Sequence, residues 1–436
     1  MNWLAVLIAS FTAFFRSFFP SVSPPPAAVS PSASSSQINI IAQGLEVPWA
    51  MAFLPDGSML VTERPGRLRL IDPIGQLQAE PVITVSEVIT QGEGGLLGLA
   101  VNSPHVYLYY TYSTDGNATF NRVVRYTYQD RTLTGAQILV DAIPGSIFHN
   151  GGRLKFGPDG YLYITTGDAQ NPSLAQDPKS PAGKILRLSP DDKLEIYSLG
   201  HRNPQGLAWD DSDQLWITEH GDSAQDEINL IKSGQNYGWP LLRGDQTRPG
   251  FTPPILHSGT DTWAPAGAIW YLEKLYFTGL RGQALFSFSP LASHLKSQYG
   301  RLRDIVLGPD GYFYVATSNR DGRGLPQKGD DKILKISPQF LGFTASFSIT
   351  TQGTRRVFSD PKYHHRSPDV FISSPDPETI YVNKPGTSWQ EFFATLPSPM
   401  QLTSDCLTTG TGQRFCTGSE GSLRFLLNGG ENPSAL

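Results

Sequence analysis

Six segments of the chain repeat one pattern of apolar and polar positions. In each segment an apolar lead meets a turn, and strand-like stretches follow in which aromatic or β-branched residues alternate with polar ones. Turns of the Asp-Gly type recur between these stretches and favour antiparallel pairing. Small sheets repeated roughly every 40–50 residues are typical of the blades of a β-propeller. The segments cover residues 53–71, 99–128, 154–189, 207–231, 268–288 and 305–337.

The stretch INIIAQGL, residues 38–45, is strand-like but has no partner in its own segment. A strand in this position can complete the last blade and close the ring. We therefore predict an all-β fold, a six-bladed β-propeller that spans residues 37–339. The repeat stops at Phe340, and residues 340–436 are predicted to form a small β-rich C-terminal extension to which the sequence assigns no function.

The first 36 residues differ from the rest of the chain. Residues 3–15 form an apolar run with the length of a signal-peptide core, and a Pro-, Ser- and Ala-rich tract follows as a disordered spacer. We interpret residues 1–36 as a signal for export to the periplasm or the extracellular space. An uncleaved N-terminal membrane anchor and a buried strand are the alternatives.

The two cysteines bear on the cellular compartment, and the net charge bears on possible partners. Cys406 and Cys416 lie close together in the sequence, which suits a local disulfide in an oxidising compartment; two buried free thiols are the alternative. The 436 residues, 39% of them hydrophobic, are enough for a sizeable core. A formal net charge of -5 gives no basic surface for nucleic acid, so we expect no nucleic-acid partner.

The most unusual local sequence is LGHRNPQGLAWD, residues 199–210, which places a histidine, an arginine and two amides around a Pro-Gln-Gly turn. In a propeller, the loops at one end of every blade converge on the central channel, so that polar residues distant in sequence can meet there. The candidates for such a site are His149, Asp168, His201, Arg202, Asn203, Gln205, Asp226, Glu227, Arg281, Arg301 and Arg303.

His149 precedes two glycines and a strand, so its ring can project into the channel. A neutral imidazole can take a proton from an alcohol when an acidic neighbour holds its tautomer, and Asp168, one strand away, is the candidate neighbour. The alternative is a histidine that only satisfies carbonyl groups of its turn.

Four arginines, Arg202, Arg281, Arg301 and Arg303, lie at predicted blade junctions. Guanidinium groups bind carboxylates in a bidentate manner and keep their charge. Arg301 and Arg303 are two apart on a predicted strand and should face the same side. If the four converge, they indicate a polyanionic small ligand; if not, each forms a surface or inter-blade ion pair.

The segment EHGDSAQDEINL, residues 219–230, offers peptide carbonyls at a Gly-Asp turn and then two carboxylates. Hard oxygen donors of this kind suit Ca²⁺, although the spacing is not that of an EF-hand. A solvated acidic loop is the alternative.

In combination, GHRNPQG, the run from DEIN to NYGWP, and GLLG at 95–98 resemble the glucose/sorbosone dehydrogenase family over residues 38–338. The resemblance implies a six-bladed propeller that holds pyrroloquinoline quinone (PQQ) and Ca²⁺ over its channel. It also implies oxidation of the C1 hydroxyl of an aldose to a lactone, with transfer of electrons to an external quinone or cytochrome.

The resemblance implies a role for each candidate. It makes His149 the base, Asp168 its supporting carboxylate, and Arg202 the arginine beside the reactive carbonyl of the quinone. The residues implied to line the cofactor pocket are Glu93, Asn203, Gln205, Arg281, Arg301 and Arg303. The implied calcium ligands are the carbonyls of Gly221 and Asp222 beside the cofactor, and Asp226, Glu227 and Tyr237 at a second site.

Three positions depart from the family pattern: Glu93 replaces a glutamine, Asp222 replaces a proline, and Arg281 stands where lysine is common. Two other functions fit a propeller with a central histidine and acidic residues. One is a calcium-dependent lactonase or esterase, which needs no arginine cluster. The other is a non-catalytic propeller that binds glycans or a partner protein.

Overall fold

The computed structural model describes residues 38–338, except 115, 117 and 290, and parts of the chain beyond. The predicted signal segment and spacer lie outside the described residues. No helix in the described part of the chain has the length and hydrophobicity needed to span a membrane. The parts described after residue 338 are 344–346, 349–351, 354–356, 358–364, 366–367, 370–372, 379–382, 388–403, 406–416, 426–427 and 430–431.

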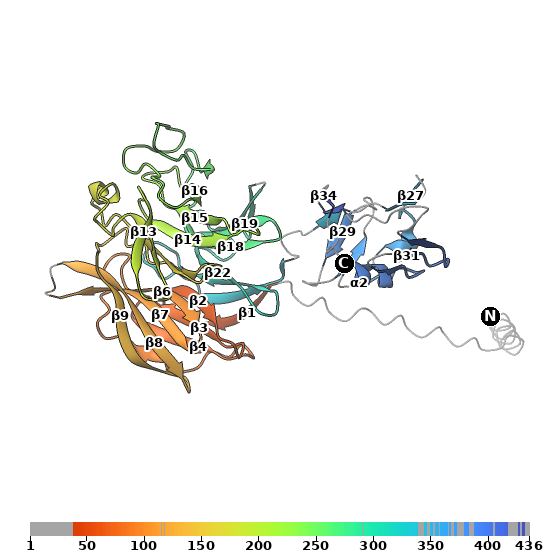
Figure 1. The fold of residues 1–436 in the computed structure, drawn as a ribbon. Helices are drawn as coiled ribbons and strands as arrows, with labels where there is room; N and C mark the ends of the chain where they lie inside the picture. The colour runs from red at the N-terminus through yellow and green to blue at the C-terminus, as the bar shows by residue number, and fades with distance from the viewer. Residues whose placement is uncertain are drawn as a thin grey trace, which may run out of the picture. The chain divides into compact units, whose positions relative to one another are not determined.

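Six four-stranded antiparallel sheets form the blades of a propeller, which confirms the predicted fold (Figure 1). We number the blades along the chain and give their strands from the inside outwards. Blade 1 holds β2 (Pro48–Phe53), β3 (Met59–Glu63), β4 (Arg67–Ile71) and β5 (Ile83–Thr84). Blade 2 holds β6 (Leu96–Asn102), β7 (His105–Ser113), β8 (Thr119–Gln129) and β9 (Thr132–Pro144). Blade 3 holds β10 (Leu154–Phe156), β11 (Leu162–Thr166), β12 (Lys184–Leu188) and β13 (Leu194–Leu199).

The second half of the chain continues the pattern and closes the ring. Blade 4 holds β14 (Pro204–Trp209), β15 (Leu215–Glu219), β16 (Glu227–Ile231) and β17 (Leu256–His257). Blade 5 holds β18 (Pro265–Tyr271), β19 (Lys274–Gly279), β20 (Ala284–Phe288) and β21 (Ala292–His294). Blade 6 holds β22 (Leu302–Leu307), β23 (Phe313–Thr317), β24 (Lys332–Ile336) and, from the start of the propeller, β1 (Ile38–Gln43). As predicted, the N-terminal strand completes the last blade.

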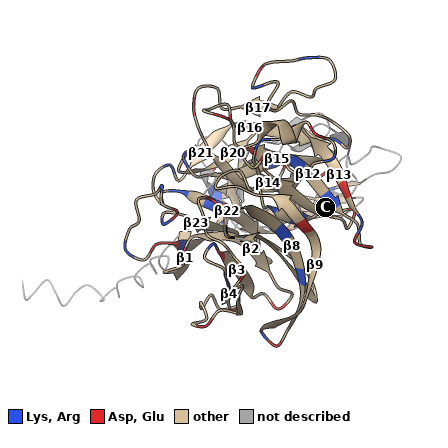
Figure 2. Ribbon diagram, turned by 90° about the vertical axis from the view of Figure 1, so that its left-hand side faces the viewer, with Lys and Arg blue, Asp and Glu red and all other residues tan. Residues whose placement is uncertain are grey.

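The core lies between the sheets. Strands β3, β11 and β23 are buried along their whole length, and the innermost strands of neighbouring blades contact one another around the channel. In Figure 1 the labels β2, β6, β14, β18 and β22 lie around the centre of the propeller. Basic and acidic positions are interspersed over its loops and strands (Figure 2).

The innermost strands share a feature that shapes the channel. In β2, β6, β14, β18 and β22 the pairing register shifts near the first residues, as in a β-bulge. A bulge turns side chains away from regular alternation and is common beside functional sites. The innermost strand of a blade begins, and the second strand ends, at the same end of the sheet. The bulged strand starts and the loops after the second strands therefore meet at one end of the channel.

Gly98, in the GLLG stretch of β6, shows how closely the blades approach. A Cβ atom at Gly98 would lie 2.0 Å from the carbonyl oxygen of Gly152 in blade 3. Only glycine allows the two backbones to come so near.

The described residues after 338 form short strands and one helix, in agreement with the predicted β-rich extension. Phe358, Phe392, Phe393 and Leu407 belong to their buried core. The domain boundary at 339/340 stays a prediction. The elements are β25 (Thr344–Ser346), β26 (Ile349–Thr351), β27 (Thr354–Arg356), η4 (Pro361–Tyr363), β28 (Val370–Ile372), β29 (Thr379–Val382), α2 (Trp389–Thr395), β30 (Gln401–Leu402), β31 (Cys406–Thr408), β32 (Arg414–Cys416), β33 (Leu426–Leu427) and β34 (Gly430–Glu431).

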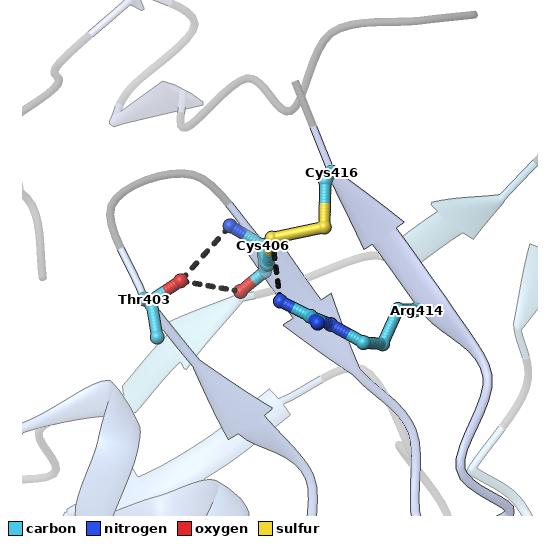
Figure 3. Close-up of a disulfide and its surroundings, with 4 residues drawn as sticks. All are labelled: Thr403, Cys406, Arg414 and Cys416. Atoms are coloured by element: carbon cyan, nitrogen blue, oxygen red, sulfur yellow. Dashed lines mark hydrogen bonds between the residues drawn. A yellow bond between two sulfur atoms is a disulfide. The ribbon is translucent and has the colours of Figure 1, made fainter. Parts of the chain in front are cut away.

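Cys406 and Cys416 form a disulfide between β31 and β32, where the two residues face each other in the register (Figure 3). Thr403 bonds to the backbone of Cys406 and tightens the turn before β31. The alternative of two buried free thiols is therefore wrong.

Candidate active site

His149 and Asp168 meet at the channel end of blade 3. His149 precedes β10 and Asp168 follows β11, and Nδ1 of His149 lies 2.8 Å from Oδ1 of Asp168. The Asp168 side chain is fully buried, whereas the His149 ring is 18% exposed. Because an ionised carboxylate only accepts hydrogen bonds, the His149 tautomer that fits this contact carries its proton on Nδ1. Nε2 is then left as a proton acceptor.

The Gly-His-Arg-Asn stretch before β14 is held by one carboxylate. Glu219, the last residue of β15, accepts hydrogen bonds from the backbone amides of Arg202 and Asn203. Its other oxygen lies 2.9 Å from Nδ1 of His201, and the His201 ring stacks on Tyr237. His201 is thus a buried support for this turn.

The Arg202 guanidinium points to carbonyl groups of the neighbouring loop. Its two Nη atoms lie 3.4 Å from the carbonyl oxygens of His220 and Asp222. Burial lowers the pKa of Arg202, and nearby Asp168 and Asp222 partly offset the effect. The Asp222 carbonyl, which the resemblance assigns to Ca²⁺, therefore faces a cation of the protein itself.

Asn203 and Gln205 connect blades 3, 4 and 6. Oδ1 of Asn203 accepts hydrogen bonds from the Gly151 amide and from Nε2 of Gln205. Oε1 of Gln205 in turn accepts a hydrogen bond of 3.0 Å from Arg303. Both amide side chains are buried.

The positions of Arg301 and Arg303 are not set by regular alternation along a strand. Arg301 lies before β22 and Arg303 is the residue at its register shift, so the alternation argument does not apply to the pair. Arg301 forms an ion pair of 2.7 Å with Asp321, whereas Arg303 lies over the ring of Trp49. Burial lowers the pKa of Arg303 to about 9, and attraction to Asp321 offsets this only in part.

Several buried polar atoms at this end of the channel have no hydrogen-bond partner among the described residues. They are Nε of Arg202, Nδ2 of Asn203, His220 Nε2 and Nε of Arg303. Three of these atoms are fixed donors, and an unpaired buried donor costs about 1–3 kcal/mol, so together they indicate a ligand that supplies acceptors.

Glu93 lies near the cations Arg202 and Arg303. Its carboxylate accepts a hydrogen bond from the His149 backbone amide at 3.2 Å and pairs with Arg323 at 2.7 Å. Burial raises the pKa of Glu93, but attraction to His220 and Arg323 outweighs this and lowers it below its ordinary value. The negative charge at this position is thus balanced in part by Arg323 of blade 6.

The positions of Arg281 and Asp226 do not match the roles that the resemblance implies. Arg281 is exposed in the turn between β19 and β20, and no ion pair or side-chain hydrogen bond joins it to the described residues. The carboxylate of Asp226 accepts hydrogen bonds from the backbone amides of Gly221, Trp263 and Ala264. Asp226 therefore ties three backbone amides together and has little capacity left for a metal ion.

Glu227 lines a small cavity together with Glu219 and Tyr237. Burial and the neighbouring Glu219 raise the pKa of Glu227 to about 8. Arg202 and Arg243 line the same cavity, but among the described residues their ion pairs are with Asp222 and not with Glu227. In the described part of the chain, however, no three His, Cys, Asp or Glu side chains are positioned together to hold a metal ion.

This propeller and its channel residues can now be compared with known proteins. A model of the glucose/sorbosone dehydrogenase family matches residues 45–326. The chain belongs to this family. Several of its relatives are named sugar dehydrogenases, which supports the prediction that this chain is an oxidoreductase.

Among these relatives, aldose sugar dehydrogenase YliI of Escherichia coli (strain K12) is 32% identical over 354 residues, which are 69% of this chain and 93% of that protein. Quinoprotein glucose dehydrogenase B of Acinetobacter calcoaceticus is 33% identical and covers 49% of this chain and 54% of its own. The PQQ-bound aldose sugar dehydrogenase of Streptomyces coelicolor has a TM-score of 0.64 and 36% identity, with coverage of 72% of this chain and 99% of its own.

Sequence reasoning missed three residues at the site of this family member. Arg323 pairs with Glu93 across 230 positions, and His220 lies buried beside Arg202 with its pKa lowered to about 4 by burial. Trp239 donates a hydrogen bond to Asp168 from a loop of the next blade. The NYGWP motif contains Trp239, so this residue could have been chosen as a candidate, whereas no motif in the sequence points to Arg323. The roles of the residues that were predicted stay predictions.

Proposed function

We propose that this protein is a PQQ-dependent dehydrogenase that oxidises the C1 hydroxyl of aldoses to lactones. One observation carries the proposal: a buried set of unpaired donors surrounds the channel beside an imidazole whose Nε2 is free to accept a proton. Electrons would leave to an external quinone or cytochrome. A lactonase or esterase would not need this set of donors.

The donors suit the chemistry of PQQ. Its carboxylates and carbonyl oxygens are planar acceptors, and Nε of Arg303, Nδ2 of Asn203 and Nε of Arg202 are buried donors without partners. The negative charge of an anionic ligand would also raise the pKa of Arg303, which burial lowers. Arg301 would act at longer range because its charge is paired with Asp321.

The protein's own residues would prepare the sugar for oxidation. Asp168 holds the proton on Nδ1 of His149, so Nε2 can take the proton of the C1 hydroxyl. Arg202 would stabilise the negative oxygen that develops nearby, because a buried guanidinium keeps its charge. Bound PQQ would supply the acceptor for the hydride from C1.

We also infer a calcium ion in the cavity beside Glu227. A buried carboxyl whose pKa is raised to about 8 gains most from a cation, and oxygen ligands suit Ca²⁺. Tyr237 lines this cavity, whereas Asp226 is engaged with backbone amides. Ca²⁺ at the carbonyls of Gly221 and Asp222 stays a prediction, because Arg202 faces the Asp222 carbonyl.

We propose that the protein is exported. The apolar run at residues 3–15 and the Pro/Ser-rich spacer are its sequence support, with an N-terminal anchor as the alternative. The disulfide between Cys406 and Cys416 supports an oxidising compartment.

We expect His149→Ala, loaded with PQQ and Ca²⁺, to lose about 10²–10⁴-fold in kcat for aldose-dependent dye reduction, since it removes the base. PQQ affinity should change little. His105→Ala, at the opposite end of blade 2, is the matched control and should keep its activity. Near-normal dye reduction by His149→Ala would refute the proposed base, and lactone hydrolysis without PQQ would favour the hydrolase.

We expect the Arg301→Ala, Arg303→Ala double variant to bind PQQ roughly 10²–10⁴-fold more weakly, because charge-assisted hydrogen bonds are lost. Fluorescence titration of the apo protein measures this without turnover. The Arg131→Ala, Arg281→Ala double variant removes the same two positive charges from exposed turns and should have only a small effect. Unchanged affinity in the double variant would mean that these arginines only join blades.

Asp226→Asn and Glu227→Gln should separate structural from metal-binding carboxylates. In EGTA, Asp226→Asn should lose about 2 kcal/mol or more of unfolding free energy, because the new amide cannot accept all three backbone hydrogen bonds. Glu227→Gln should lose little in EGTA but should abolish the rise in Tm that Ca²⁺ causes in wild type. Thermal unfolding with and without Ca²⁺ measures both effects, and a full Ca²⁺ response in Glu227→Gln would contradict the assignment.

A further inference from the structure

We propose that Trp239 is a positioning residue for the His149–Asp168 pair. Its indole N–H donates a hydrogen bond of 2.8 Å to Oδ2 of Asp168, the oxygen that His149 does not use. The chemistry that this serves rests on the proposed function. The hydrogen bonds themselves belong to the protein without cofactor, so they can be tested separately.

The Asp168 carboxyl group faces donors from three directions. Oδ1 lies 2.8 Å from Nδ1 of His149 and accepts a hydrogen bond of 2.8 Å from the Gln170 amide, while Oδ2 accepts the indole N–H of Trp239. The ionised carboxylate matches three donors best, because it has acceptors only and no proton of its own to place. Trp239 fixes the rotation of this carboxylate about its side-chain bond, and so fixes the direction in which Oδ1 meets His149.

Trp239 reaches blade 3 from blade 4. It lies in the long connection between β16 and β17, and its backbone amide donates to the Gly200 carbonyl at 3.0 Å. Its own carbonyl accepts a hydrogen bond of 2.6 Å from Gln176, which also exchanges two amide hydrogen bonds with Asn236. The loop is therefore fastened on both sides of the indole.

The indole ring also lies beside the second residue proposed to act on the sugar. The guanidinium carbons of Arg202 and Arg243 lie 5.3 Å and 5.1 Å from the ring of Trp239. Asp222 forms an ion pair of 2.6 Å with Arg243 and lies 3.8 Å from Arg202. One aromatic side chain thus orients both the base, through Asp168, and the cation at Arg202.

The kinetic test uses Trp239→Phe, which keeps an aromatic ring but removes the N–H donor. In the loaded enzyme we expect kcat to fall roughly 10-fold, while KM and PQQ affinity change by less than about 3-fold. In an Asp168→Asn background the same substitution should cost less than about 2-fold, because its target carboxylate is already gone. Losses that multiply in the double variant would overturn the proposal.

The matched control is Trp216→Phe. Trp216 donates the same kind of hydrogen bond, 2.8 Å from its indole nitrogen to Oδ2 of Asp210, and Asp210 follows the innermost strand at the opposite end of blade 4. Trp216→Phe should keep the wild-type kcat. A loss equal to that of Trp239→Phe would overturn the proposal, because it would mean that any lost indole bond slows the enzyme.

A second readout needs neither cofactor nor substrate. The imidazole ¹⁵N shifts of His149 in the apo protein should show a single Nδ1-protonated tautomer in wild type and in Trp216→Phe, and a mixture of tautomers in Trp239→Phe. An unchanged tautomer in Trp239→Phe would overturn the proposal. If the wild-type protein failed to oxidise aldoses, the proposed function would fall, and the tautomer result would still decide the role of Trp239.

Discussion

The channel of this propeller holds buried cations whose hydrogen bonds go to neutral groups rather than to carboxylates. Arg153 pairs with Asp304 at 2.9 Å, but Lys155 bonds to backbone carbonyl groups and Arg303 to the neutral amide of Gln205. Burial lowers the pKa of Lys155 to about 8 and that of Arg303 to about 9. Buried cations without full pairing are unfavourable by several kcal/mol, so a rigid ring of sheets has to hold them in place. The site depends on this constraint, because cations that are not paired with carboxylates of the protein would favour an anionic ligand.

The blades could be read from the sequence because their signals are local. Alternation, Asp-Gly turns and the unpaired stretch at residues 38–45 each depend on neighbouring residues, and each predicts a sheet that is present. The pair of His149 and Asp168 was also accessible, since only 19 positions and the hairpin of β10 and β11 separate the two residues. Once the repeat is known, both must lie at the same end of blade 3.

The rest of the site depends on features that one sequence does not contain. Alternation failed for Arg301 and Arg303 because a register shift at the start of β22 interrupts it. Arg281 has a suitable charge and spacing, yet its turn exposes it. The contact between Glu93 and Arg323 joins blades 2 and 6 across 230 positions, and only ring closure brings them together. Charge and motif therefore identified candidates, whereas burial and hydrogen-bond partners distinguish Arg303 from Arg281.

The central claim is that the unpaired donors of the channel form a binding site for PQQ. Isothermal titration of the wild-type apo protein with PQQ, at two salt concentrations, tests it most directly. The account predicts saturable binding of one PQQ per chain, weaker at higher salt because charged groups are involved. No saturable binding at either salt concentration would contradict it.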